Sequence, residues 1–331
     1  MEASMKKFLK LAIAMAVSGT ICTAQADVFS DMEKKNASSY NALLKGKTTE
    51  EKLEIEHAAA VHEDPEIRAL PYGRATRNYA SEDSELKFFT EQLQKEQDSK
   101  VLAAGLRSLM NNLKVSPALY ELYKKSATHA DSSVRSAAMM GLINTNNSSV
   151  AGIESEAVKF LDDKDPKIAM SACKELGRAK NAAAIDRVEA MLKSYDPAQA
   201  KLLGSCAEGL LYMWYDAPFF KNFDARAYKM TLDYLKLPRS TDMPAWSVIS
   251  NLKKAPKPEW FKLSDGAYKP ADVVAVLADI AKDKQAPKMA REYSVEAIGI
   301  HGTKADLEAL AKELADDPVA KKIENAMKTA K

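Results

Sequence analysis

The stretch DPEIRA, residues Asp64–Ala69, opens with an Asp-Pro pair that an aliphatic residue closely follows, and a similar stretch, DDPVAKK, occupies Asp316–Lys322. Related Asp-led segments begin at Asp98, Asp131 and Asp165, at steps of 34, 33 and 34 residues. A looser series continues with Asp196, Asp242, Asp283 and Asp317. Self-similarity at such a period is typical of repeat architectures.

Each Asp-led segment has the chemistry of a helix start. Asp caps the free N–H groups of a first turn, and Pro suits the first helical position. Small and aliphatic residues follow at helical spacing, as in Val134, Ala138 and Leu142, and a second amphipathic segment comes after each short break. The clearest second segments are 118–128, 153–161, 185–192 and 307–314. The pattern predicts an all-α protein of repeated antiparallel helical hairpins.

Three segments resemble the HEAT-repeat family and its armadillo-like relatives: DPEIR at 64–68, SVRSAA at 133–138 and REYSVEAIGIHG at 291–302. The resemblance implies a right-handed α-α superhelix, a HEAT-like solenoid of about seven helical hairpins, which we expect over residues 48–331. It also implies that the chain binds partners, mostly proteins, along an extended concave surface.

Residues 1–26 have the pattern of a bacterial secretory signal peptide. A basic opening from Met5, MKKFLKL, precedes a short apolar run and a small-x-small cleavage site at Ala24–Ala26. We therefore expect a periplasmic or secreted protein, with residues 27–47 as an arm or a partial capping helix. A lipid anchor at Cys22 is disfavoured, because an isoleucine precedes it where a lipobox has a small residue.

The charge balance bears on the class of partner. The chain has 48 Lys and Arg against 46 Asp and Glu, and removal of residues 1–26 takes away three Lys and one Glu, which leaves a formal net charge of zero. Binding to nucleic-acid phosphates calls for a basic excess or stripe. No later apolar run approaches the roughly 20 residues of a membrane-spanning helix. We therefore expect neither a nucleic-acid partner nor an integral membrane segment, and the oligomeric state stays open.

The sequence offers little catalytic chemistry. His57 and His62 are five residues apart, which places them on different sides of a helix, and His129 and His301 fall where helices end. The chain has no Gly-x-Ser-x-Gly elbow, no phosphate-binding Gly-rich loop and no Cys-x-x-Cys motif. We predict no catalytic residue, no metal site and no cofactor.

Two cysteines remain after cleavage, Cys173 and Cys206, on the first helices of consecutive repeats. An exported protein permits a disulfide between them. However, packed helix axes usually stand about 8–10 Å apart, and a disulfide needs Cα atoms within about 7 Å. Two alternatives therefore stay open: a disulfide between Cys173 and Cys206, or two separate cysteines buried as small apolar side chains.

Enlarged, aromatic-rich repeats occupy about residues 196–282, because half of the aromatic residues lie between Tyr212 and Tyr268. Three prolines within 253–270 favour an extended or turning chain there. One interpretation is a loop that presents aromatic and basic side chains to a partner; the other is a loop that packs back onto the repeats. The candidate partner-binding residues of this loop are Trp260, Phe261, Tyr268, Lys257 and Lys262.

The second helices supply further candidates for partner contacts: Lys124, Lys159 and Arg187. The sequence thus favours a non-enzymatic protein-binding scaffold or adaptor of the bacterial cell envelope. An alternative is an enzyme or small-ligand binder, lyase-like or specific for cell-wall fragments, with a pocket near Trp214, Trp246 and Trp260. A third is a passive structural component of the envelope.

Overall fold

The computed structural model describes residues 28–30, 32, 34–73, 79–80, 83–215, 223–237, 244–254 and 258–330, with the main chain alone at 244–245 and 258–260. Every regular element within these ranges is a helix. The chain divides into two compact units, Met1–Val150 and Ala151–Lys331. The expected signal peptide, Cys22 and Asp242 lie outside the described residues.

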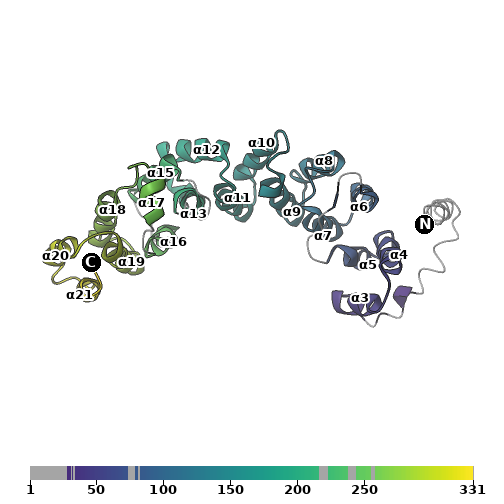
Figure 1. The fold of residues 1–331 in the computed structure, drawn as a ribbon, viewed down its shortest axis with the longest axis horizontal. Helices are drawn as coiled ribbons and strands as arrows, with labels where there is room; N and C mark the ends of the chain where they lie inside the picture. Colours follow the sequence, from purple (N-terminus) through teal and green to yellow (C-terminus); the bar gives the residue numbers. More distant parts are fainter. Residues whose placement is uncertain are drawn as a thin grey trace. The chain divides into compact units, whose positions relative to one another are not determined.

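The first unit contains two layers of helices. The first helices, which follow the Asp-led segments, are α5 (Pro65–Ala69), α7 (Ser99–Leu109) and α9 (Ser132–Ile143). The second helices are α6 (Ser84–Lys95) and α8 (Pro117–Ser126). Contacts run from α5 to α7 to α9 in one layer and from α6 to α8 in the other, as expected of stacked hairpins (Figure 1).

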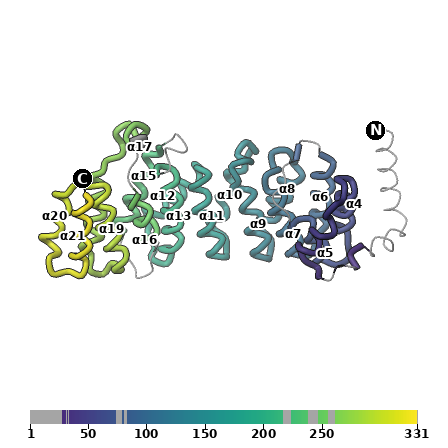
Figure 2. Tube along the Cα trace, turned by 60° about the horizontal axis from the view of Figure 1, so that its bottom comes forward, coloured from purple at the N-terminus to yellow at the C-terminus, as the bar shows by residue number. Residues whose placement is uncertain are grey.

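The second unit repeats this arrangement. Its first helices are α11 (Pro166–Arg178), α13 (Ala200–Trp214), α16 (Pro244–Leu252), α19 (Lys288–His301) and α21 (Ala320–Met327). Its second helices are α10 (Ile153–Val158), α12 (Ala182–Lys193), α15 (Ala225–Leu235), α18 (Pro270–Lys282) and α20 (Lys304–Glu313). Successive first helices contact one another throughout, and the second helices do so from α10 to α18 (Figure 2). We call these the first-helix and second-helix layers.

Within residues 27–47, the structure contains helix α3 (Ala37–Leu44), and α4 (Thr49–Ala60) follows it. Tyr40 and Leu44 of α3 are buried in a cluster with Ala59 and Ile67. A capping box formed by Thr48 and Glu51 begins α4. The start of the chain's described part therefore covers the apolar side of the first Asp-led helix.

The Asp residues cap their helices as the sequence predicts. The side chains of Asp64, Asp98, Asp131 and Asp165 each accept a hydrogen bond from the backbone N–H two residues later. Prolines of the predicted irregular segment also begin helices: Pro258 opens α17 (Pro258–Leu263) and Pro270 opens α18. Pro is accommodated there because the first helical N–H has no intrahelical acceptor. The expectation of an extended or turning chain within 253–270 is therefore wrong for 258–263, which is helical.

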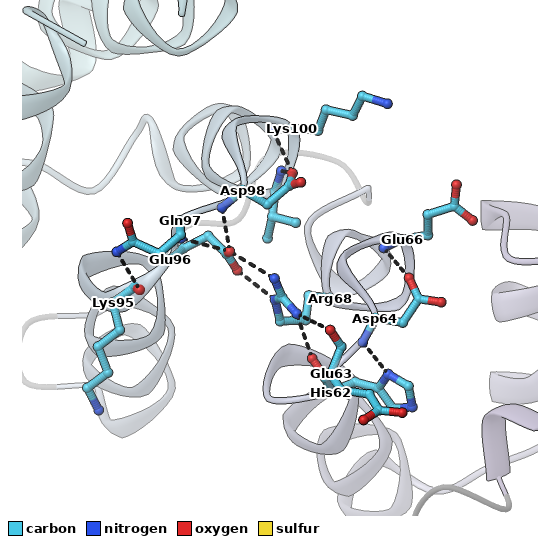
Figure 3. A network of polar contacts seen from close by, with 11 residues as sticks. His62, Glu63, Asp64, Glu66, Arg68, Lys95, Glu96, Gln97, Asp98 and Lys100 are labelled. Atoms are coloured by element: carbon cyan, nitrogen blue, oxygen red, sulfur yellow. Dashed lines mark hydrogen bonds and ion pairs between the residues drawn. The ribbon is translucent and has the colours of Figure 1, made fainter. Parts of the chain in front are cut away.

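An arginine ties the start of a first helix to the end of the helix before it. Arg68 donates from Nη1 to the carbonyls of His62 and Glu63, at 2.9 and 2.7 Å (Figure 3). Its Nε and Nη2 donate to the two carboxylate oxygens of Glu96, at 2.8 and 3.0 Å. Glu96 also accepts the N–H groups of Gln97 and Asp98, which fixes the turn before α7.

The same arginine contact recurs in both units. In the first unit, Arg135 donates from Nη1 to the carbonyls of His129 and Ala130, both at 2.9 Å. In the second, Arg291 donates to the Ala281 carbonyl at 2.8 Å and forms a 2.7 Å ion pair with Asp317. The guanidinium of Arg291 lowers the pKa of the Asp317 carboxyl. We call this recurring contact the arginine clamp.

Helices α11 and α13 approach very closely. A Cβ atom on Gly177 would stand 2.3 Å from the Gly209 carbonyl carbon, so only glycine fits. One turn or so earlier on each helix, Cys173 and Cys206 form a disulfide, with Cα atoms 4.7 Å apart. The two glycines thus remove the spacing objection to a disulfide, because they let the helix backbones come closer than usual.

Replacement of Arg68 by Met should lower the free energy of unfolding by about 1.5–3 kcal/mol at neutral pH, because the buried Glu96 carboxylate and the carbonyls of His62 and Glu63 lose a charged donor. Burial raises the pKa of Glu96, but hydrogen bonds from Arg68 and the backbone outweigh it and hold that pKa below its usual 4.5. The contribution of the ionised Glu96 to the free energy of unfolding is therefore fully present above pH 4.5. It is lost as the pH falls through the folded-state pKa of Glu96. Urea unfolding of both proteins over this range should show a smaller acid loss in the variant. Arg187→Met, which breaks an exposed ion pair with Asp162, is the control; an equal effect of both would contradict the clamp.

Removal of the disulfide by Cys173→Ala with Cys206→Ala should lower the free energy of unfolding by about 3–4 kcal/mol in the chain-entropy model, given the separation of 33 residues. Thermal unfolding with and without reductant measures the loss. Reductant should leave the double variant unchanged. Alkylation of both thiols in unfolded, unreduced wild-type protein would show that the bond does not form.

Candidate interaction surface

The basic residues expected on the second helices are each paired with an acid. Lys124 is half-buried, 3.0 Å from Glu121. Lys159 lies in a 3-10 turn after α10 and contacts Glu156 at 2.7 Å. Arg187 of α12 contacts Asp162 at 2.8 Å. Such exposed pairs contribute little to stability, and they leave no excess positive charge at these three positions.

The loop residues do not act as one exposed group. Phe261, with 49% of its surface exposed, and Lys262 are both accessible at the end of α17. Tyr268 is buried, so the expectation that it contacts a partner is wrong. Lys257 and the Trp260 side chain lie outside the described residues.

Tyr268 belongs to an aromatic core that joins the enlarged repeats. It stacks near the fully buried Trp214, at 6.2 Å between ring centroids, and packs against Phe223 and Tyr228. The Trp214 indole donates to Thr231 Oγ1 at 3.0 Å. Trp214 and the accessible Trp246 therefore do not line one pocket: the first is core, and the second lies on the surface. The packing interpretation holds for this part of the aromatic-rich segment.

A buried hydrogen-bonded chain fixes Tyr268. His301 Nε2 lies 2.6 Å from the Leu252 carbonyl, and His301 Nδ1 lies 2.8 Å from Tyr268 Oη. Because the carbonyl only accepts, Nε2 carries the proton and Tyr268 donates to Nδ1. Burial lowers the pKa of His301, while its bond to Leu252 acts in the opposite direction. The neutral His301 ring therefore makes its full contribution to the free energy of unfolding above pH 6.5. This contribution declines at lower pH, because His301 binds a proton more readily in the unfolded chain than in the folded one.

Burial also raises the pKa of Tyr268, and that of Tyr228 to about 12. Tyr228 donates to the Lys269 carbonyl at 3.0 Å. Both phenols therefore stay neutral at physiological pH and act as hydrogen-bond donors that hold the chain before α18. Their role is structural.

A different group of side chains is exposed on the first-helix layer of the second unit. Trp246 of α16 and Met289 of α19 have 39% and 48% of their surfaces exposed. The Trp246 ring lies 6.4 Å from that of Tyr293, and Lys253 Nζ sits 3.7 Å above the Tyr293 ring. We call this group, with Glu296 and Lys322, the Trp246 patch.

Charge organises the edge of the Trp246 patch. Glu296 accepts from Lys253 at 3.0 Å and from Lys322 of α21 at 2.8 Å. Partial burial raises the pKa of Glu296, but the two lysines outweigh it and lower that pKa. Met289, Tyr293 and Glu296 are not among the residues predicted from the sequence, although the chain carries a signal for them. They recur at steps of four and three along α19, which places them on one side of the helix.

A groove of about 400 Å³ lies between α18 and α20. Its lining comprises Pro270, Ala271, Val274, Ala275, Ala278, Lys282, His301, Gly302, Thr303, Asp306, Ala309, Leu310 and Glu313. Its polar groups bind one another: Lys282 pairs with Glu313 at 2.6 Å, and Thr303 with Asp306 forms a capping box. Many of the lining side chains are short, and Pro270 of the 253–270 segment is among the lining residues.

The described residues contain no group of three or more His, Cys, Asp or Glu side chains placed to hold a metal ion. Within the same ranges, no helix is both long enough and apolar enough to cross a membrane.

Comparison with known families identifies one part of the chain. The family model for HEAT repeats matches residues 117–203, from the start of α8 into α13. This part of the chain is similar to HEAT repeats. No curated protein sequence matches it. Among solved structures, the crystal structure of an engineered protein is similar at 16% identity and a TM-score of 0.38, over 93% of this chain and 95% of that one; at that score the likeness supports no conclusion. HEAT repeats commonly act as protein-interaction scaffolds, which fits the exposed surface described above.

Replacement of Tyr268 by Phe should lower the free energy of unfolding by about 1–3 kcal/mol, because His301 Nδ1 would stay buried without a donor. Tyr293→Phe, which removes a hydroxyl from a half-buried ring in the Trp246 patch, should have a much smaller effect. Chemical denaturation of the three proteins measures both changes. Equal stabilities would show that the Tyr268–His301 bond contributes nothing.

Proposed function

We propose that this protein is a non-catalytic scaffold that binds a protein partner in the bacterial cell envelope. The observation that carries the proposal is the HEAT-repeat stack, matched at residues 117–203 and built as paired helical layers in both units. Such stacks place many side chains on extended surfaces with little change in the core, because each repeat packs only on its neighbours.

The proposed compartment rests on two features. The first is the signal-peptide pattern of residues 1–26. The second is the Cys173–Cys206 disulfide. Disulfides persist in oxidising compartments and are rare in the cytosol. Together they favour export to the periplasm or beyond.

In-cell crosslinking of the tagged protein, followed by mass spectrometry, should identify a distinct partner protein from the envelope. Replacement of the whole 253–270 segment is unsuitable as a variant, because it removes the buried Tyr268. Single exposed positions, such as Phe261→Ala and Trp246→Ala, should keep the fold. We expect Phe261→Ala or Trp246→Ala to reduce partner capture severalfold, because exposed aromatic side chains are common interface anchors.

Fractionation of the same cells tests the compartment. The protein should be released with periplasmic proteins or found in the medium, with an N-terminus near Asp27. Crosslinks that contain only this chain would favour a structural component instead, and cytosolic protein with its first residues intact would rule out the envelope.

A further inference from the structure

The Trp246 patch has the anatomy of a protein-binding site. Trp246 and Met289 expose apolar surface, and the half-buried Tyr293 ring lies beside Trp246 and one helical turn after Met289. Charged groups stand at its edge, where Lys253 and Lys322 meet Glu296. Interface anchors are commonly Trp, Tyr and Met with a polar rim, because the apolar centre gains most from leaving water.

The patch is held in shape before any partner arrives. Lys253 is fixed between the Tyr293 ring at 3.7 Å and Glu296 at 3.0 Å. Leu252, the residue before it, accepts the buried hydrogen bond from His301, which anchors the end of α16. Less side-chain freedom is therefore lost on binding than at a surface of free lysines.

The charges of the Trp246 patch determine which sign of charge a partner should carry. One carboxylate, Glu296, serves two ammonium groups, Lys253 and Lys322, which leaves an excess of one positive charge. Elsewhere on α21, the exposed Lys321 is balanced by the exposed Glu324 three residues later. The other ion pair of α19, Lys288 with Glu292, is neutral as a whole. A negatively charged partner is complementary to this surface.

We propose that the Trp246 patch binds an acidic segment of a partner protein. An aromatic or aliphatic side chain of the segment packs on Trp246 and Met289, and its carboxylates face Lys253 and Lys322. This inference rests on the scaffold function proposed above and names the chemistry of the partner. It also moves the binding surface from the second helices to the first-helix layer.

The test is selection of a displayed library of random linear peptides on the purified mature protein. Enriched peptides should be rich in Asp and Glu around an aromatic or aliphatic residue. A selected peptide should bind about tenfold or more weakly to Trp246→Ala. It should bind severalfold more weakly to Lys322→Glu, with the loss greatest at low salt. Met140→Ala, at an exposed apolar position outside the patch, is the matched control and should bind normally.

Circular dichroism and melting curves check that each variant folds, and Lys322→Glu lies on a different helix from Trp246, so the test survives the loss of either variant. Enrichment of neutral or basic peptides, no enrichment, or unchanged binding to both patch variants would each overturn the proposal. In-cell crosslinking distinguishes failure of the patch proposal from failure of the scaffold proposal. Partner capture that Trp246→Ala leaves intact refutes the patch alone, whereas no capture by any form refutes the scaffold.

Discussion

Helix ends inside a stack of hairpins leave carbonyl groups that need donors, and the arginine clamp satisfies them. Arg68 and Arg135 donate to carbonyls of the turn after the preceding helix, and Arg291 donates to a carbonyl in the last turn of α18. The guanidinium groups of Arg68 and Arg291 also meet a carboxylate that lies just before the next first helix, Glu96 or Asp317. One side chain thereby joins three consecutive elements. The conformation of each turn therefore depends on contacts with the adjacent helices. Such nearest-neighbour contacts are typical of a repeat architecture.

The first-helix layer is dense because its residues are small. Gly177 and Gly209 bring two helix backbones into contact, and the Cys173–Cys206 disulfide then links the same two helices. In the first unit, Gly141 makes room for the Tyr123 ring of a second helix. Among the described residues, three large apolar side chains are nevertheless exposed on first helices: Met140, Trp246 and Met289.

The two layers consequently differ in what they offer a partner. Lys124, Lys159 and Arg187 near the second helices are committed to local ion pairs. On α16 and α19, apolar surface at Trp246 and Met289 lies next to lysines that share a single carboxylate. Desolvation of aromatic surface contributes more to binding than exposed ion pairs do. The enlarged repeats support this surface from within, through the buried Trp214, Tyr268 and His301.

The sequence by itself determined the helical class, the repeat period and the capping role of Asp64 and its equivalents, because these depend on hydrogen bonds within a few residues. It did not decide which aromatic residues are exposed. Tyr268 is in the core, where a histidine 33 residues away accepts a hydrogen bond from its hydroxyl. Trp246 of α16 stays exposed beside Tyr293 of α19. Nor did it decide the fate of the cysteines, which depended on a close approach of Gly177 and Gly209. Contacts between distant residues have no periodic trace in the chain, so only the tertiary structure assigned them.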